Sequence, residues 1–492
     1  MATTHLLSLP CARRSCNVPG DVQFTTLAYA KFFALCFVVT WLCARLRSVR
    51  LCFLLGASYF FYAQSGVAFL ALIYVCSSAD FLLSHAIGRA REPTERKAWL
   101  TLTVVMNLGV LAYFKYAKFG VETALSALEA LGVHVPAPVL AITLPVGISF
   151  FTFESMSYVI DVYRGELEPH PSYLEYLTFV AFFPHLVAGP IVRPRDLLPQ
   201  LARPPLWREG EASSALLLIA TGLFKKLAIA DYLALNLVDR VFDAPTQYSA
   251  LECYVAMLSY AVQIYADFSG YTDIAIGSAA LLGVRFPPNF AAPYQAHDIV
   301  DFWRRWHISL STWLRDYLYI PLGGNRHGSG RTYLNLIITM LLGGLWHGPS
   351  WTFVVWGALH GVALAFNRAL RERFGDVLGS RPALRVPATF ITFQFVVFAW
   401  IFFRAHTFRD ARAIFAELLT FSGYHPNLDP RVLLVLALGL GMHYLPLELE
   451  AKLRERFAAL PGVVQGVALF AVLLLVRRMA SAEAVPFVYF QF

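Results

Sequence analysis

His347 is the residue of this chain whose type and setting most directly suggest chemistry. It ends an apolar run and is followed by Gly348 and Pro349, a pair that ends a helix. Ionisable residues in a membrane segment are costly and usually face the bundle interior or a water-filled path. Gly343 and Gly344 lie one helical turn earlier and leave room for a neighbouring helix or for a substrate chain. We therefore predict a functional role for His347, the ordinary alternative being a hydrogen-bonded packing histidine.

A second histidine, His307, lies in residues 285–331, a stretch that is aromatic and charged at once. Asp298 is a suitable N-cap, and the residues after it predict one helix over Ile299–Tyr319, ended by a proline and two glycines. At helical spacing Trp303, His307 and Ser311 share one face. A histidine in such company can be oriented by its neighbours. The alternative is an interfacial helix whose arginines snorkel to the membrane surface.

The chemistry open to His347 is proton transfer, because a neutral imidazole can act as a general base. Burial favours the neutral form, whereas the C-terminal end of a helix favours the charged form. The sequence leaves that balance open.

Asp267 and Tyr271 form part of a polar insert between apolar runs, and they are candidates for substrate contacts. Their alternative role is to cap or break a helix. The sequence contains no glycine-rich phosphate loop, no GxSxG elbow and no cluster of metal ligands, so we predict no bound metal.

The elements that must hold these side chains are predicted to be membrane helices. Hydrophobic residues make up 58% of the 492 residues and charged residues 15%, whereas soluble proteins carry about a quarter charged residues. About 20 apolar residues cross a bilayer, so the apolar segments predict roughly 10–13 spans. Glycine and proline break some segments, as at 145–147 and 189–190, and broken helices are tolerated only where the backbone is buried or faces water. We expect an all-α polytopic bundle with re-entrant segments around a cavity.

The net charge of +8 is distributed in short basic clusters between apolar segments, for example Arg45, Arg47 and Arg50. This pattern predicts cytoplasmic loops rather than a nucleic-acid surface. Residues 1–20 are predicted to be a polar N-terminal extension, and residues 21–492 a single transmembrane domain.

Several motifs, taken in order, resemble the membrane-bound O-acyltransferase family, and most closely its bacterial branch that acetylates exopolysaccharides such as alginate. The resemblance covers nearly the whole chain from about residue 22. The matching segments are Pro145–Phe153, Ser157–Arg164, Leu186–Ile191, Tyr265–Ala275, Asp301–Asn325, Gly344–Gly348 and Phe487–Phe492.

The resemblance implies that His347 is the principal catalytic residue and His307 a second essential one, both near a tunnel open to both membrane faces. It implies a multi-pass protein of the inner membrane that takes an acyl group from a cytoplasmic thioester, with acetyl-CoA as the donor substrate and no bound cofactor. A periplasmic acetyltransferase, an exopolysaccharide acceptor and membrane lipid are the implied partners.

In such a reaction His347 would be the base, and His307 would orient the acceptor or polarise the thioester carbonyl. Arginines are candidates for donor phosphates, which a guanidinium binds at two points, and structural anchoring is the alternative for each of them. The candidate donor- or substrate-binding residues are Trp303, Arg304, Arg305, Ser311, Arg315, Asn325, Arg326, Trp346, Asp267 and Tyr271.

Two other functions stay open at this point. The same fold could transfer D-alanine from a carrier protein towards teichoic acid. A chain with intramembrane histidines could also be a transporter or channel with a proton path.

Overall fold

The structure is a computed structural model that describes residues 23–187, 189–207, 210–375, 381–480 and 485–488. Throughout these ranges the regular secondary structure is helical and no strand occurs, which confirms the predicted all-α fold. The predicted N-terminal extension, residues 1–20, lies outside the described residues.

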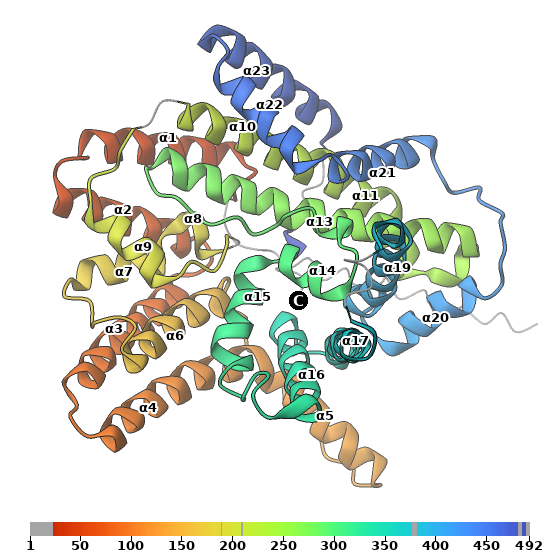
Figure 1. The fold of residues 1–492 in the computed structure, drawn as a ribbon, viewed down its shortest axis with the longest axis horizontal. Helices are drawn as coiled ribbons and strands as arrows, with labels where there is room; N and C mark the ends of the chain where they lie inside the picture. Colours follow the sequence, from red (N-terminus) through yellow and green to blue (C-terminus); the bar gives the residue numbers. More distant parts are fainter. Residues whose placement is uncertain (1–22, 188, 208–209, 376–380, 481–484, 489–492) are drawn as a thin grey trace, which may run out of the picture.

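Most helices follow one another with short connections, while residues 131–147 and 419–429 form longer ones (Figure 1). The first part of the chain forms α1 (Leu27–Leu42), α2 (Arg47–Ala63), α3 (Val67–Arg89), α4 (Pro93–Leu111), the π-helical η1 (Ala112–Tyr116) and α5 (Ala117–Ala130). The middle forms α6 (Ile148–Arg164), α7 (Tyr173–Ala181), α8 (Phe183–Leu186), α9 (Pro194–Ala202), α10 (Glu211–Leu223), η2 (Phe224–Ala230), α11 (Asp231–Leu233), η3 (Ala234–Val238), α12 (Asp239–Asp243), η4 (Pro245–Gln247), α13 (Ala250–Leu281) and η5 (Pro293–Gln295). The last part forms α14 (Ile299–Arg305), α15 (Ile308–Leu314), η6 (Arg315–Tyr319), α16 (Gly328–His347), α17 (Trp351–Phe374), η7 (Pro382–Leu384), α19 (Arg385–Arg404), α20 (Phe408–Leu418), α21 (Pro430–His443), α22 (Leu447–Ala458) and α23 (Gly462–Met479).

Membrane-spanning helices are present, as predicted, but fewer are continuous than the sequence suggested. Within the described ranges six helical stretches are long and apolar enough to cross a bilayer. They are Val67–Arg89, Pro93–Ala130, Glu211–Asp243, Trp351–Phe374, Pro382–Arg404 and Gly462–Met479. A seventh span results if the pair α21 and α22, bent by 89°, is taken as one. Other apolar segments form helices too short for the test, such as α1 with 16 residues and α7 with 9, so the chain is a polytopic membrane protein with broken helices.

The long helix α13 runs through the middle of the molecule beside α10 (Figure 1). Its first turn is closed by a capping box between Ser249 and Glu252, and residues on all sides of it are buried, as expected of a central helix. A Cβ atom on Gly270 would lie 2.7 Å from the carbonyl oxygen of Gly222 on α10. Glycine at this crossing therefore lets the two backbones touch.

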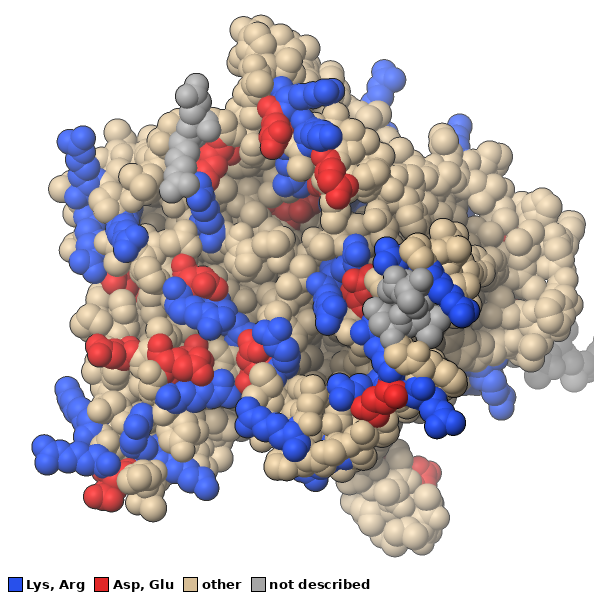
Figure 2. Space-filling view, viewed as in Figure 1, with Lys and Arg blue, Asp and Glu red and all other residues tan. Residues whose placement is uncertain are grey.

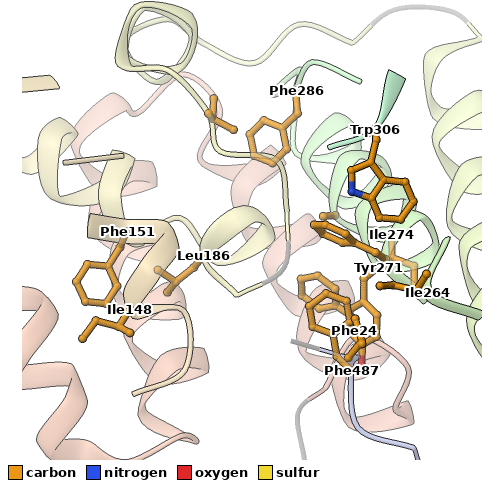
Figure 3. Packing of buried hydrophobic residues seen from close by; sticks show 14 of the residues in the cluster. Phe24, Ile148, Phe151, Leu186, Ile264, Tyr271, Ile274, Phe286, Trp306 and Phe487 are labelled. Carbon is orange, nitrogen blue, oxygen red and sulfur yellow. The ribbon is translucent and has the colours of Figure 1, made fainter. Parts of the chain in front are cut away.

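A short segment after the last long helix, residues 485–488, inserts beside α13. Figure 3 shows Phe487 next to Tyr271 and Phe24 in the buried hydrophobic cluster, and the ring centroids of Phe487 and Tyr271 are 4.4 Å apart. The backbone N–H of Val488 donates to Asp267 Oδ2 at 2.7 Å. The segment is thus held by both a ring contact and a hydrogen bond.

Candidate active site

The segment around His307 is not one helix, and the prediction of a continuous helix over Ile299–Tyr319 is wrong. Asp298 does cap α14, accepting from the backbone N–H of Asp301 at 2.8 Å. However, α14 ends at Arg305, and His307 adopts the left-handed conformation with φ 42° and ψ 57° before α15 begins. Trp303, His307 and Ser311 consequently do not share a helical face. A non-glycine residue in this conformation costs about 1–3 kcal/mol and is most common at functional sites.

The break is held by partners that are distant in sequence. Asn289 O accepts the backbone N–H of Ile308 at 2.9 Å, and Ser311 Oγ donates to Trp306 O at 3.0 Å. Ser311 therefore stabilises the kink, and its substrate contact stays a prediction.

Asn289 also fixes the proton on His307. Its Oδ1 accepts the backbone N–H of Ser309 at 3.1 Å, and a backbone N–H is always a donor, so the atom facing this group is oxygen. The same Oδ1 lies 3.2 Å from His307 Nδ1 and accepts from Ser309 Oγ at 2.9 Å. Nδ1 must therefore carry a hydrogen, and in the neutral imidazole Nε2 is then the acceptor. Sequence reasoning missed Asn289 and Ser309, because no periodicity links residue 289 to residue 307.

His347 is the last residue of α16 and is buried, with 3% of its surface exposed. Its ring lies edge-on to the rings of Trp356 and Phe403, at centroid distances of 5.0 and 5.2 Å. The ring centroid of Trp346 lies 5.1 Å from that of His347 and 6.0 Å from that of His307. The two predicted histidines thus approach the same tryptophan, in a wall of aromatic rings.

Protein atoms occupy the space beside the two glycines that precede His347. A Cβ atom on Gly344 would lie 2.3 Å from the carbonyl oxygen of Phe353 on α17, and one on Gly343 would lie 3.2 Å from Leu314 Cδ1. Of the two alternatives, a neighbouring helix and a substrate chain, the structure shows the helix. The packing around His347 is dense.

Lys115 contacts the same helix end and was also missed. A lysine in an apolar stretch is itself a signal of function, and this signal could have identified it. Its Nζ donates to the backbone oxygens of Trp346 and, at 3.3 Å, of His347.

The other predicted binding residues lie in different places. The ring of Trp303 packs on the ring of Trp356 at a centroid distance of 5.8 Å, and Trp356 in turn contacts His347. Arg305 is tied to Asp301 at 2.9 Å, while Arg304 is exposed.

Asp267 and Tyr271 face the C-terminal segment rather than the histidine pair. Asp267 forms a buried ion pair with Lys226 at 2.7 Å, and Lys226 Nζ also donates to Val485 O at 3.0 Å. The ring of Phe268, next to Asp267, lies 4.7 Å from the His307 imidazole. Asp267 and Tyr271 thus help to hold the part of α13 whose Phe268 ring packs on His307.

Arg315 and Arg326 line an open cavity of about 740 Å³ on the charged surface. Arg164, Arg195 and His327 add to its basic lining, with Glu166 and Asp316 as acidic members. Asn325 lies next to this region, where its side chain accepts from Tyr319. Figure 2 shows a face over which basic side chains are widely spread, many with acidic ones beside them. The cavity is suited to a ligand that carries several negative charges.

A second cavity of about 290 Å³ lies among α10, α13, α21 and α22, with Lys225, Asp273, Glu450 and Arg454 in its lining. Lys225 pairs with Asp273 at 2.7 Å, and Arg454 with Glu450 at 2.5 Å. Asn289 also lines it, so this cavity reaches the residue that holds His307.

Comparison with known proteins decides what kind of chain carries this site. The family model described as the membrane-bound O-acyltransferase family matches residues 34–405. The chain belongs to this family. The histidine pair is therefore the candidate active site of a membrane-bound O-acyltransferase.

The relatives of this membrane-bound O-acyltransferase have related activities. A probable alginate O-acetylase of Azotobacter vinelandii is 44% identical over 77% of this chain and 74% of its own length. A peptidoglycan O-acetyltransferase of Helicobacter pylori is 36% identical over 75% of this chain and 73% of its own. A teichoic acid D-alanyltransferase of Bacillus subtilis is 28% identical over 53% of this chain and 69% of its own.

Proposed function

We propose that this O-acyltransferase moves acetyl groups from a cytoplasmic thioester, acetyl-CoA, across the inner membrane for O-acetylation of an exopolysaccharide such as alginate. A separate periplasmic acetyltransferase completes the transfer to the polymer. The observation that carries the proposal is the meeting of His307 and His347 at Trp346, in a chain similar to a probable alginate O-acetylase.

In the proposed reaction the acceptor hydroxyl oxygen attacks the thioester carbonyl carbon. A C–O bond forms and the C–S bond breaks. His347 takes the hydroxyl proton and returns it to the leaving thiolate, so that the products are an ester and a free thiol.

Of the two roles considered for His307, the hydrogen bond to Asn289 favours one. With Nδ1 donating to Asn289, neutral His307 presents an acceptor at Nε2 and cannot polarise a carbonyl from that atom. The attacking hydroxyl gives its single hydrogen to His347, so His307 orients the acceptor by accepting a hydrogen bond from a neighbouring hydroxyl of the same acceptor.

The arginine-lined cavity is the proposed docking place for the phosphates of the donor. It contains Arg326 and Arg315, of which Arg315 pairs with the lining residue Asp316 at 2.7 Å, while Arg305 lies elsewhere and pairs with Asp301. Two consecutive helices connect this cavity with the first basic loop. Arg164, at the end of α6, donates to Asp316 O in the cavity, and Arg47 of the loop pairs with Glu175 at the start of α7. Basic loops lie on the cytoplasmic side of membrane proteins, where acetyl-CoA is present.

Transfer of D-alanine is the second candidate, favoured by the similarity to a teichoic acid D-alanyltransferase. Its donor would be a carrier protein bearing the thioester, and an acidic carrier would also suit a basic cavity. A transporter or channel would move its substrate without breaking a thioester.

The test uses the purified full chain in proteoliposomes that enclose an oligosaccharide acceptor and periplasmic extract as the source of the separate acetyltransferase, with radiolabelled acetyl-CoA added outside. We expect release of free CoA and transfer of label, both lost in His347→Gln and both retained in His406→Gln, whose side chain is exposed. Turnover of a D-alanyl carrier thioester but not of acetyl-CoA would favour the second candidate. Solute flux without thioester cleavage would contradict both.

A further inference from the structure

Lys115 is a buried lysine inside the membrane-spanning stretch Pro93–Ala130, with 9% of its surface exposed. Its Nζ donates to three oxygen atoms: Trp346 O, His347 O at 3.3 Å and Ser149 Oγ at 3.3 Å. Among the ion pairs of the described residues none involves this lysine. Burying a lysine without a carboxylate partner costs free energy, so its contacts with backbone oxygens indicate a functional role.

The last turn of α16 needs donors from outside the helix. The final carbonyls of any helix have no partner within it. Here Gly348 is extended, with φ −162°, and supplies one N–H to Gly344 O at 3.4 Å, while Pro349 has no N–H to give. The usual glycine cap in left-handed conformation is therefore absent at this end.

One neighbouring segment supplies the missing donors. Lys115 serves the carbonyls of Trp346 and His347, and the adjacent Tyr116 donates its O–H to Leu345 O at 2.7 Å. Both residues belong to η1, a π-helical turn, and such turns are frequent at functional sites. Three consecutive carbonyls at the end of α16 are thus capped by two consecutive side chains.

We propose that Lys115 is a positioning residue for His347: its side chain fixes the last turn of α16 and thereby the direction of the imidazole. The rings of Trp356 and Phe403 pack on the imidazole, and Lys115 holds the backbone of His347. Without these bonds the last turn frays, as uncapped helix ends do. This inference rests on the proposed role of His347 as the base.

The experiment compares Lys115→Met, which keeps the length of the side chain and removes its donors, with Lys118→Met, which removes an exposed lysine of the same helical stretch. Both are made in the full chain and assayed in proteoliposomes with acetyl-CoA. A misplacement of about 1 Å at a catalytic group can cost about 10²-fold in rate. We expect kcat of Lys115→Met to fall about 10–100-fold at nearly unchanged KM, and Lys118→Met to match the wild type.

A second measurement separates positioning from general stability. In a His347→Gln background, Lys115→Met is expected to cause no further loss of the residual rate, because a residue that acts through His347 has nothing left to position. An equal loss in both backgrounds, or a wild-type kcat in well-expressed Lys115→Met, overturns the proposal. If Lys115→Met does not accumulate, Lys115→Leu replaces it, since leucine also has no donor and is shorter; a wild-type kcat there overturns the proposal, and a reduced kcat at unchanged KM supports it.

Failure of the proposed function looks different. A wild-type protein that does not cleave acetyl-CoA, or an active His347→Gln variant, refutes the function or the base. Failure of the Lys115 proposal alone requires an active wild type, an inactive His347→Gln and an active Lys115→Met.

Discussion

Replacement of Asn289 by leucine tests whether the orientation of His307 matters for turnover. Leucine branches at the same carbon as asparagine and is larger, but it has no acceptor. The backbone N–H of Ser309 and the Nδ1–H of His307 would lose their common partner, which now lies 3.1 and 3.2 Å away. The imidazole could then place its hydrogen on Nε2 and leave Nδ1 to accept from Ser309 Oγ, which is 3.4 Å distant. In that tautomer Nε2 can no longer accept from a substrate hydroxyl.

The structure sets the expected size of both effects. Each buried donor left without an acceptor costs about 1–3 kcal/mol, so the free energy of unfolding falls by about 2–6 kcal/mol with the hydrogen on Nδ1 and by about 1–3 kcal/mol, for the Ser309 N–H alone, once the hydrogen has moved to Nε2. The partner that orients a functional histidine is typically worth about 10–100-fold in activity. We expect kcat of Asn289→Leu to fall by about this factor. Asn289→Asp keeps an acceptor at the same place and should retain more activity than the leucine variant.

The assay is acetyl-CoA cleavage by equal amounts of purified protein, with thermal unfolding in detergent measured in parallel. Asn427→Leu is the matched control, because the side chain of Asn427 is exposed. The reasoning is refuted if Asn289→Leu turns over at the wild-type rate, or if Asn289→Asp is as slow as Asn289→Leu at equal stability.

Three further predictions follow from the fold and the site. Loss of a general base lowers the rate about 10²–10⁴-fold, so His347→Gln should lower polymer acetylation nearly to background at normal protein level. Substantial acetylation by that variant contradicts the role of His347 as the base. His347→Ala should also reduce the protein level, because the packing around His347 is dense. A cysteine at exposed Ser48 should resist a membrane-impermeant reagent in intact cells, and ready labelling from outside would place the loop on the other side. Phe487→Ala should destabilise the protein by about 3–5 kcal/mol in thermal unfolding and loosen the packing of Phe268 on His307. Phe374→Ala, at a residue 65% exposed, should not. Equal unfolding temperatures of the two variants would contradict the role of Phe487.

The parts of the site that could be predicted from the sequence are those set by local chemistry. His347 ends its helix because Gly348 and Pro349 follow it, and Asp298 caps α14 because its carboxylate can reach the N–H three residues on. Residue type and spacing along one segment are enough for both. The all-α membrane fold follows in the same way from the apolar segments.

The parts that could not be predicted depend on partners far away in sequence. The spacing of Trp303, His307 and Ser311 fits a helix. However, hydrogen bonds to Asn289 compensate the cost of the left-handed conformation of His307, and the helix breaks at this residue. Local periodicity contains no information about such a partner. The same holds for Lys115, whose acceptors lie 231 and 232 residues further along the chain.

The insertion of residues 485–488 beside α13 has a consequence for biogenesis. These residues are made after every helix of the described chain, yet Phe487 packs on Phe268, the ring that backs His307, at 5.6 Å. Because the chain is made from its N-terminus, the surface of α13 that this segment covers lacks its cover until residues 485–488 have been made. The enzyme would then reach its active shape only after translation has passed residue 488. A product terminated before Val485 would insert into the membrane and still lack the segment that completes its interior.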